Sequence, residues 1–585
     1  MKRGKLTAVV AFTVSAMLAL SGCGGSDTAT DAVDNGEEIT LDVYDDFANY
    51  AGEQKGWFAQ VIKDKFNIKL NIIAPNVSGG GSTLFDTRSA AGDLGDIVLY
   101  NANNHSTADL IKAGLIADMT PYLDDAEYIK QYSSATDSIN EVAGQESGVW
   151  GIPGSVSAQS PETSSEGNEP TFGPYIRWDY YAEIGYPEIK DMDDLLDVLE
   201  QMQEQARADT GSTDVYALSL FKDWDDNMMN NAKQPTCFYG FDEMGFVLAK
   251  ADGSDYEDVS EEGGIYEQTL EFFNQAYQRG LVDPESSTQS YDTMYAKYQE
   301  GNVLFSFWPW LGQAAYNTTE NKAAGKGFML APLEDMQIFS YGATPNGGTY
   351  VIALGAKAEY KQRCVDFINW LYSPEGIYAS GGQTSGSSAG VEGLTWELND
   401  DGEPVLTDFG YQVKYGSGGT VPDEYGGGNY TDGVSALNFV TVLASDIDPE
   451  TGYAYDASLW PSVIESQFST ALDNDWSEHM GGAKTAMEYL EANDKILVAP
   501  GASFVKPEDD SQISTLRGQL KTTVVNASWQ AVFASSDSEF QSILDGMRTD
   551  LEGLGYDQVL EVDMKNAQDQ DAARKQIVED YQSEN

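Results

Sequence analysis

The sequence ITLDVY at residues 39–44 alternates Ile39, Leu41 and Val43 with polar residues, which predicts a strand with one buried face. Elements of both kinds then alternate along the chain: a helix at 57–66, a strand at 68–73, a helix at 82–91, a strand at 96–100 and a helix at 107–113. Strands that alternate with helices predict an α/β fold with a parallel sheet. Ligands of such sheets lie outside the carboxyl ends of the strands, which gives the first binding candidates: Asp45, Asp46, Tyr100 and Asn101.

The first residues of the chain predict export. Lys2, Arg3 and Lys5 precede a mostly apolar run at 6–20, so residues 1–22 are interpreted as a secretory signal peptide that is later removed. The run is shorter than the ~20 apolar residues that a membrane-spanning helix needs. We therefore do not expect this segment to remain as a membrane anchor.

A lipid anchor is expected instead. Cys23 follows Leu20-Ser21-Gly22, a sequence that resembles the bacterial lipobox, in which the cysteine becomes the lipid-modified first residue. We expect Cys23 to hold the protein at the extracellular face of the cell membrane. Residues 23–38 are polar and would form a flexible tether. The alternative interpretation is an ordinary signal peptide with a chance cysteine.

The charge of the chain argues against several partners. Of 585 residues, 94 are acidic and 33 are basic, which gives a formal net charge of -61. Such a charge disfavours nucleic acid, a polyanionic ligand or an anionic lipid surface bound by charge, whereas solubility and self-repulsion explain it simply. We expect a monomer. The length without the leader predicts about two to four domains.

Few residues are suited to catalysis or metal binding. The only histidines are His105 and His479, and neither lies in a recognisable motif, so we expect no enzyme, no metal and no cofactor. The glycine-rich stretch 79–83 lacks the GK[ST] ending of a phosphate loop. The acidic residues of 446–450 begin like a calcium loop, but no glutamate closes it, and a surface turn is the simpler interpretation.

Several later residues are expected to lie in cores. Apolar residues recur with helical spacing at 191–207, 265–279 and 360–372, a pattern typical of helices that pack on one face. Cys237 and Cys364 are expected to be buried thiols, and a bridge between them stays an open alternative.

Short motifs occur along the chain in a particular order, and each is weak alone. They are AAGDLGDI at 90–97, LIKAGLIADMTPYL at 110–123, WGIP at 150–153, YIRWDYYAEIG at 175–185, GLVDP at 280–284, and YQEGNV at 298–303 before an aromatic run. Together they resemble the bacterial extracellular solute-binding proteins of sugar importers, the group that includes maltose-binding protein. Gly95 stands where that family usually has proline. The resemblance covers most of residues 39–385 and is thinner from Gly386 onward.

The resemblance implies a two-lobed fold of the periplasmic-binding-protein type II kind, with lobes joined by hinge segments and a ligand cleft between them. The crossings between lobes would fall near Pro153 and Pro332. The first lobe would then contain residues 39–153 and 332–385, and the second 154–331 and 386–585, with an insertion near 411–460 that has no recognisable pattern. Closure on the ligand would let the permease of an ABC importer distinguish loaded from empty protein.

The aromatic content fits a sugar ligand, because flat rings stack on the C–H faces of sugars. The chain has 11 Trp and 33 Tyr. In the sequence FSFWPW at 305–310, strand alternation puts Phe305 and Phe307 on one face, and Pro309 ends the strand, so Trp308 and Trp310 are expected at a loop. The resemblance places Trp310 where the maltose-binding relatives stack a sugar ring. The alternative is that both tryptophans cover a core.

Weaker ligand candidates are chosen by their position at strand ends or in aromatic, polar loops. They are Asp46, Tyr100, Asn101, Arg177, Trp178, Trp224, Tyr341 and Trp460. Arg177 can equally pair with Asp179. Three functional alternatives stay open: a binding protein for peptide or another small solute, a receptor that serves a sensor kinase, and a surface glycoside hydrolase with two carboxylates across a cleft.

Overall fold

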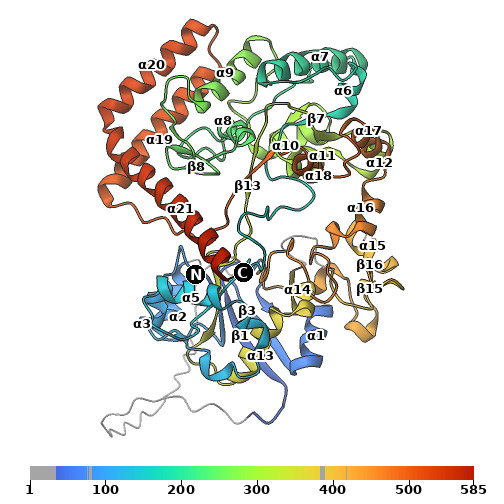
Figure 1. Ribbon diagram of the computed structural model, residues 1–585, viewed down its shortest axis with the longest axis vertical. Helices are drawn as coiled ribbons and strands as arrows, with labels where there is room; N and C mark the ends of the chain where they lie inside the picture. The colour runs from blue at the N-terminus through green and yellow to red at the C-terminus, as the bar shows by residue number, and fades with distance from the viewer. Residues whose placement is uncertain (1–33, 76, 78–81, 382–388, 417, 585) are drawn as a thin grey trace, which may run out of the picture.

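The computed structural model describes residues 34–75, 77, 82–381, 389–416 and 418–584. The predicted signal peptide, the predicted anchor Cys23, most of the predicted tether and the glycines at 79–81 lie outside the described residues. Within the described part, none of the helices has the length and apolar character needed to cross a bilayer. Helices and strands form two lobes, which lie one above the other in Figure 1.

The first lobe contains the predicted parallel sheet. Strand β1 (Ile39–Asp45) pairs in parallel with β3 (Ile68–Ile73) and with β4 (Ile97–Asn101), and β14 (Tyr350–Gly355) pairs antiparallel with β4. The sheet order is β2-β3-β1-β4-β14-β5, with β6 also on β14, where β2 is Gly52–Glu53, β5 is Ile116–Ala117 and β6 is Ile152–Pro153.

Both faces of this sheet are covered. Leu41 and Val43 point into one core and Tyr44 into another, as alternation along a strand requires. Helices α1 (Gly56–Phe66), α13 (Lys361–Leu371) and α14 (Pro374–Ser380) contribute to the first core. Helices α2 (Ser82–Ala90) and α3 (Thr107–Lys112) contribute to the second, and α5 (Ser133–Val142) contacts both. The sheet therefore has a fixed register, and its carboxyl edge has a fixed position.

The second lobe is built around a larger core with small antiparallel sheets. Strand β7 (Tyr175–Arg177) lies between β11 (Phe305–Ser306) and β12 (Phe328–Leu330). A second sheet contains β8 (Phe241–Met244), β9 (Val247–Lys250) and β10 (Tyr256–Asp258). The surrounding helices are α6 (Trp178–Glu183), α7 (Met192–Thr210), α8 (Asn230–Lys233), α9 (Ile265–Gln278), α10 (Tyr291–Gln299), α11 (Pro309–Tyr316), α12 (Thr319–Ala323), α17 (Ala471–His479), α18 (Ala486–Ala492), α19 (Ser511–Val532) and α20 (Asp537–Leu554).

The segment from 389 to 463 belongs to the first lobe, which corrects the predicted assignment of 386–585 to the second. Its aromatic side chains Trp396, Tyr430 and Trp460 are buried in the first-lobe core. The indole of Trp57 on α1 stacks on Tyr430, with ring centroids 5.3 Å apart, and donates a hydrogen bond to its carbonyl oxygen. The elements of this segment are β15 (Trp396–Leu398), β16 (Pro404–Leu406), α15 (Asp408–Tyr415) and α16 (Pro461–Gln467).

The described chain passes between the two cores at 157–171, 340–350 and 464–471. The first crossing lies after Pro153, because Val156 is still in the first-lobe core. The second lies after Pro332 and not at it, because Leu333 and Phe339 are still in the second-lobe core. The third was not predicted, since it exists only because the segment from 389 to 463 packs on the first lobe.

The first two crossings are joined by backbone hydrogen bonds. The N–H of Ala343 donates to the carbonyl of Thr163 over 2.7 Å, and the N–H of Ser165 donates to the carbonyl of Tyr341 over 2.9 Å. Strand β13 (Ile338–Tyr341), where the second crossing begins, also pairs in parallel with β17 (Ile496–Ala499). The lobes are therefore connected by a band of adjacent segments.

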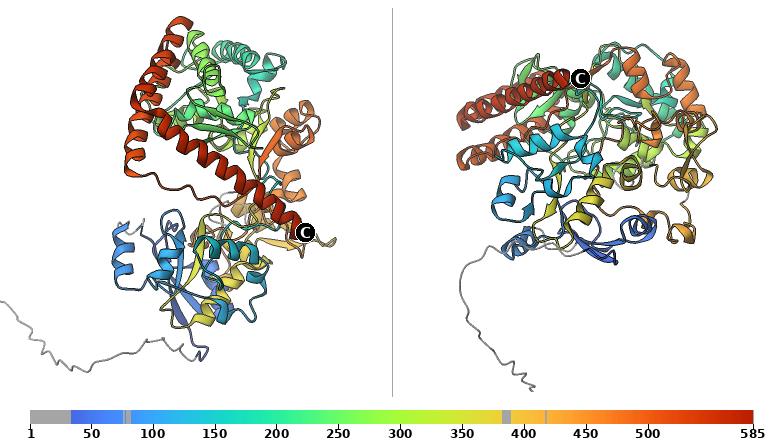
Figure 2. Two further views of the ribbon diagram at one scale, coloured as in Figure 1. Left: turned by 60° about the vertical axis from the view of Figure 1, so that its left-hand side comes forward. Right: turned by 60° about the horizontal axis from the view of Figure 1, so that its bottom comes forward.

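The last helix, α21 (Tyr556–Glu584), extends from the second lobe past this band toward the first (Figures 1 and 2). At its start, Asp563 is fully buried and pairs with Arg517 on α19. Gly245 has φ +69° and lies so close to the Asp563 carboxylate that no larger side chain fits there. Near its end, the Tyr581 hydroxyl donates to the carbonyl of Ala158 over 3.1 Å. The helix thus contacts both the second lobe and the first crossing.

Candidate ligand-binding site

Trp310 presents an exposed aromatic face on the second lobe. The sequence predicted a loop after Pro309. Pro309 is instead the first residue of α11, a position where proline is well tolerated. Trp310 is 42% exposed and stacks on Trp308, with ring centroids 4.5 Å apart and an interplanar angle of 19°. Trp308 itself is buried, and its indole donates to the Gln234 side chain over 3.1 Å. Trp308 is therefore a support for Trp310 and not a second exposed surface.

Trp224 extends this surface. It is 43% exposed, stacks on Tyr291 with ring centroids 4.6 Å apart, and lies 5.9 Å from the Trp310 ring. We call Trp224, Tyr291, Trp308 and Trp310 the aromatic platform. Two exposed indoles side by side are unusual on a protein surface unless a ligand covers them.

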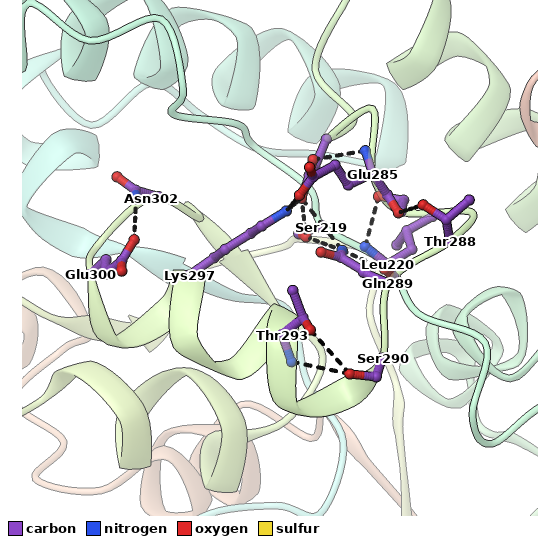
Figure 3. A network of polar contacts seen from close by, with 12 residues as sticks. Ser219, Leu220, Glu285, Thr288, Gln289, Ser290, Thr293, Lys297, Glu300 and Asn302 are labelled. Carbon is purple, nitrogen blue, oxygen red and sulfur yellow. Dashed lines mark hydrogen bonds and ion pairs between the residues drawn. The ribbon is translucent and has the colours of Figure 1, made fainter.

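A polar network fixes the loop that leads to the platform (Figure 3). Lys297 forms ion pairs with Asp283 at 2.6 Å and with Glu285 at 2.7 Å. The amide of Gln289 donates to the carbonyl of Leu220 over 2.7 Å. Ser290 caps α10 by accepting from a backbone N–H in its first turn, and Tyr291 is the first residue of that helix. The platform is therefore held in place before any ligand arrives.

A pocket of about 410 Å³ lies beside Trp310. Trp310 and Gln313 line it from one face of α11, as their spacing of three residues requires, and Asn317 lines it just after the helix ends. The volume falls within the range of ~300–1,000 Å³ that is usual for small-molecule sites. The full lining is Glu169, Pro309, Trp310, Gln313, Ala314, Asn317, Lys322, Met329, Phe468 and Asp473.

The pocket offers both hydrogen-bond donors and acceptors. Glu169 accepts from the Tyr175 hydroxyl over 2.8 Å and from the Gln313 amide over 3.4 Å. Lys322 forms an ion pair with Asp473 at 3.1 Å. Burial raises the pKa of Glu169 to about 7, although both hydrogen bonds act to lower it. An aromatic face bordered by a carboxyl, an amide and an ammonium group can bind a molecule that has one apolar face and several hydroxyls.

The carboxyl edge of the first-lobe sheet gathers other predicted residues. Asp46 lies 3.4 Å from the His105 ring nitrogen, and Asn101 pairs with Tyr350 across β4 and β14. Tyr350 is exposed and stacks on Phe47 with ring centroids 4.1 Å apart. Two predicted positions thus lie near an exposed tyrosine that the sequence did not single out.

Asp45, at the same edge, does not reach the surface. It is fully buried and accepts hydrogen bonds from the backbone N–H groups of Phe47 and Ala48. Burial raises the pKa of this carboxyl well above its usual value, and the two hydrogen bonds act against the shift. Its role in the structure is to shape the turn after β1.

Three other candidates are buried scaffold residues, contrary to expectation. The Tyr100 hydroxyl is bonded to Thr107 over 2.8 Å, and the Trp178 indole donates to Asp475 over 2.6 Å. The Trp460 indole donates to a backbone carbonyl of its own segment over 2.8 Å. Because each polar atom is satisfied inside the protein, none of these side chains is available to a ligand.

Arg177 and Tyr341 are also placed by the structure. Arg177 is buried and donates two hydrogen bonds to the Asp179 carboxylate, at 2.9 and 2.6 Å, which is the alternative that the sequence left open. Tyr341 is exposed, but it lies on β13 in the band between the lobes, and its hydroxyl donates to Asp242 over 2.8 Å. It is not brought together with the aromatic platform.

The sequence missed most of the pocket. Gln313 was recoverable, because reading Pro309 as the start of a helix would have placed it on the same face as Trp310. Glu169, Lys322 and Asp473 come from three separate segments and carry no local signal. Their convergence depends on tertiary structure alone.

The remaining chemical candidates have structural roles. Asp446 accepts from the Ser157 hydroxyl over 2.7 Å, and Asp448 accepts from the Tyr378 hydroxyl over 3.0 Å. Both are buried, so the expected surface turn is in fact tied to the protein interior. No group of three or more possible metal ligands occurs among the described residues. Cys237 and Cys364 are free and buried, as expected.

Two α/β lobes joined by adjacent strands, with an aromatic and polar pocket on one of them, define a ligand-binding protein. Residues 57–387 match the model of one family, described as bacterial extracellular solute-binding protein. The chain belongs to this family, as the order of its motifs indicated. No curated protein sequence matches the chain.

Solved structures with the same fold cover almost the whole chain. An "HMO binding ABC-transporter associated Solute Binding Protein" from Bifidobacterium longum infantis is similar with 14% identity and TM-score 0.57, over 91% of this chain and 99% of that one. An extracellular solute-binding protein from Bifidobacterium longum subsp. infantis is similar with 12% identity and TM-score 0.56, over 92% and 100%. An EF-hand mutant of the substrate-binding protein FusA from S. pneumoniae, in complex with fructo-nystose, is similar with 14% identity and TM-score 0.53, over 91% and 99%.

Proposed function

We propose that this protein captures a neutral oligosaccharide between its two lobes and delivers it to the permease of an ABC importer, without chemical change to the sugar. The observation that carries the proposal is the exposed Trp310 ring at the edge of a pocket that contains Glu169, Gln313 and Lys322. A sugar ring has an apolar C–H face for the indole and hydroxyls for the polar groups.

Closure of the lobes would complete the site. The carboxyl edge of the first-lobe sheet carries Asn101 and the exposed Tyr350, which would meet the ligand from the other side. Contacts that form only in the closed state would supply the free energy for closure, and the importer would recognise that state. The adjacent strands of the crossings would serve as the hinge.

Similar proteins support a carbohydrate ligand. Of the three solved structures, one is an HMO-binding protein and another is a complex with fructo-nystose, and both share the fold over nine tenths of this chain. The formal net charge of -61 favours a neutral sugar over an anionic one. Partnership with an ABC importer and the absence of enzymatic activity are proposed on the same basis.

The membrane attachment is proposed from the sequence. Cys23 would carry the lipid after removal of residues 1–22, and residues 24–38 would tether a monomeric binding domain at the extracellular face of the membrane. Labelling with a radioactive or clickable fatty acid tests the anchor directly: the label should be incorporated by the wild-type chain and lost in Cys23→Ser.

The first experiment is a thermal-shift screen. The mature chain with Cys23→Ser is mixed with kestose, maltotriose, lacto-N-biose or trialanine, and a ligand that binds only the folded state should raise the melting temperature saturably. We expect a shift with at least one sugar and its loss in Trp310→Ala. A response to trialanine alone would replace the sugar by a peptide ligand. Release of new reducing ends from the bound sugar would instead indicate a glycoside hydrolase.

A further inference from the structure

The segment from 389 to 463 has one exposed aromatic side chain that its packing does not explain. Trp396, Tyr430 and Trp460 of this segment are buried in the first-lobe core, whereas Tyr415, the last residue of α15, is 42% exposed. Tyr411 lies one turn earlier on the same helix, with ring centroids 6.2 Å apart, so the two tyrosines share one face of α15.

This face of α15 is connected to the pocket beside Trp310 through α16. The Ser466 hydroxyl donates to the Tyr411 hydroxyl over 3.4 Å. Helix α16 ends at Gln467, whose carbonyl accepts from Lys322 of the pocket over 3.2 Å. The next residue, Phe468, lines the pocket. Helix α15 thus contacts α16, which leads from the first lobe to Phe468 in the wall of the pocket.

A second set of contacts connects the segment from 389 to 463 with the same pocket. The Asp456 carboxylate lies 4.0 Å from the position that a Cβ atom on Gly167 would occupy, and the Asn168 amide donates to the carbonyl of Ser458 over 3.0 Å. Glu169 of the pocket follows directly in the chain. Burial lowers the pKa of Lys414 to about 8, and the negative charge of Asp456 opposes this shift. Helices α15 and α16 lie below α12 and α17 in Figure 1, on the side of the third crossing.

We propose that the end of α15 forms the first lobe's half of the ligand site next to the third crossing, with Tyr415 as a second stacking surface for a sugar ring. This inference rests on the proposed function. A ligand with one ring on Trp310 and another on Tyr415 has at least two sugar units, so the segment from 389 to 463 selects oligosaccharides over monosaccharides. It also explains why this segment packs on the first lobe, because it must move with that lobe on closure.

Affinity measurements test the role of Tyr415. Calorimetric titration of Tyr415→Ala with kestose, maltotriose and lacto-N-biose should give a dissociation constant about tenfold weaker than the wild type for whichever sugar binds. Tyr415→Phe keeps the ring and should bind within about twofold. Leu398→Ala, at an exposed position of β15 in the same segment, is the matched control and should bind like the wild type. Wild-type affinity in Tyr415→Ala would overturn the inference.

Cross-linking tests the same surface without depending on the identity of the sugar. The pair Tyr415→Cys and Gln313→Cys should be joined by a short bis-maleimide, and a bound sugar should raise the yield. Leu398→Cys with Gln313→Cys is the control pair and should stay unlinked. Both pairs are made in the mature chain with Cys23→Ser, where the remaining native thiols, Cys237 and Cys364, are buried and should not react. Failure of the first pair to cross-link overturns the inference. If the first pair cross-links but the protein binds no sugar, Tyr415 and Gln313 face each other as inferred. Only the proposed function is then contradicted.

Discussion

Two clusters of aromatic rings in this protein have almost the same spacing between ring centroids and opposite surroundings. In the aromatic platform, Trp224 lies 4.6 Å from Tyr291 and 5.9 Å from Trp310. In the first-lobe core, Trp396 lies 4.8 Å from Tyr378 and 5.9 Å from Trp460. Trp224 and Trp310 are more than 40% exposed, whereas Trp460 is 0% exposed. The spacing of the rings alone therefore does not distinguish a ligand surface from a core, but exposure does.

The largest effect on stability is expected when a ring is removed from the buried cluster. Trp460→Ala should lower the free energy of unfolding by about 3–5 kcal/mol, because it leaves a large cavity and an unpaired backbone carbonyl. Urea unfolding followed by circular dichroism measures this. Trp460→Phe should recover part of the loss. If Trp460→Ala unfolded at the wild-type urea concentration, the cluster would not be a core.

The matching change in the platform should affect binding and leave stability nearly unchanged. Trp310→Ala should weaken sugar binding by about 2 kcal/mol, or roughly 30-fold, and change the free energy of unfolding by less than about 1 kcal/mol. Calorimetric titration and urea unfolding of the same preparation give both values. Trp308→Phe serves as a comparison that keeps a supporting ring beneath Trp310. A large loss of stability without a loss of affinity would mean that Trp310 is a core residue and does not contact the ligand.

The carboxyl of Glu169 in the pocket should make the stability of the protein depend on pH in a way that the buried aromatic cluster does not. The ordinary pKa of Glu169 is 4.5, and burial raises it to about 7 in the folded protein. Between these values the folded state binds more protons than the unfolded state, so stability from this group decreases as pH rises through the window and the penalty is complete above pH 7. In Glu169→Gln, the loss of stability between pH 5 and pH 8 should be smaller than in the wild type by about 1–2 kcal/mol. Equal losses in both proteins would contradict the buried, protonated state.

The smallest effect is expected at the first-lobe edge. Tyr350 is exposed but already stacks on Phe47, so only part of its surface is open to a ligand. Tyr350→Ala should weaken sugar binding about threefold, or by ~0.6 kcal/mol. Titration against the same sugar as for Trp310→Ala allows direct comparison. An effect larger than that of Trp310→Ala would move the principal site to the first lobe.

Local patterns predicted the elements well. The alternation in β1 and the cap at the start of α7, where Asp191 accepts two backbone N–H groups, depend on residues close in sequence. The motif order also led to the correct family. Pro309 was misread because a proline suits both the end of a strand and the first turn of a helix.

Tertiary packing decided what the sequence could not. Trp310 and Trp460 have similar local surroundings in the sequence, each beside a proline, yet one is exposed and the other is buried. The pocket combines Glu169, Lys322 and Asp473 from three distant segments. The assignment of 389–463 to the first lobe likewise follows from contacts with α1 and α14, which no local spacing reports.

The three crossings also determine how the chain must fold. The first-lobe sheet needs β14 beside β4, and the first-lobe core is not complete until Trp460 and Val463 are available. The second lobe in turn needs α17 to α21, which follow that segment in the chain. Contacts so distant in sequence give slow folding, because long loops must close before they are stabilised. Neither lobe can be completed while the ribosome is still making the middle of the chain, because the first lobe needs residues up to Val463 and the second needs the helices that follow it.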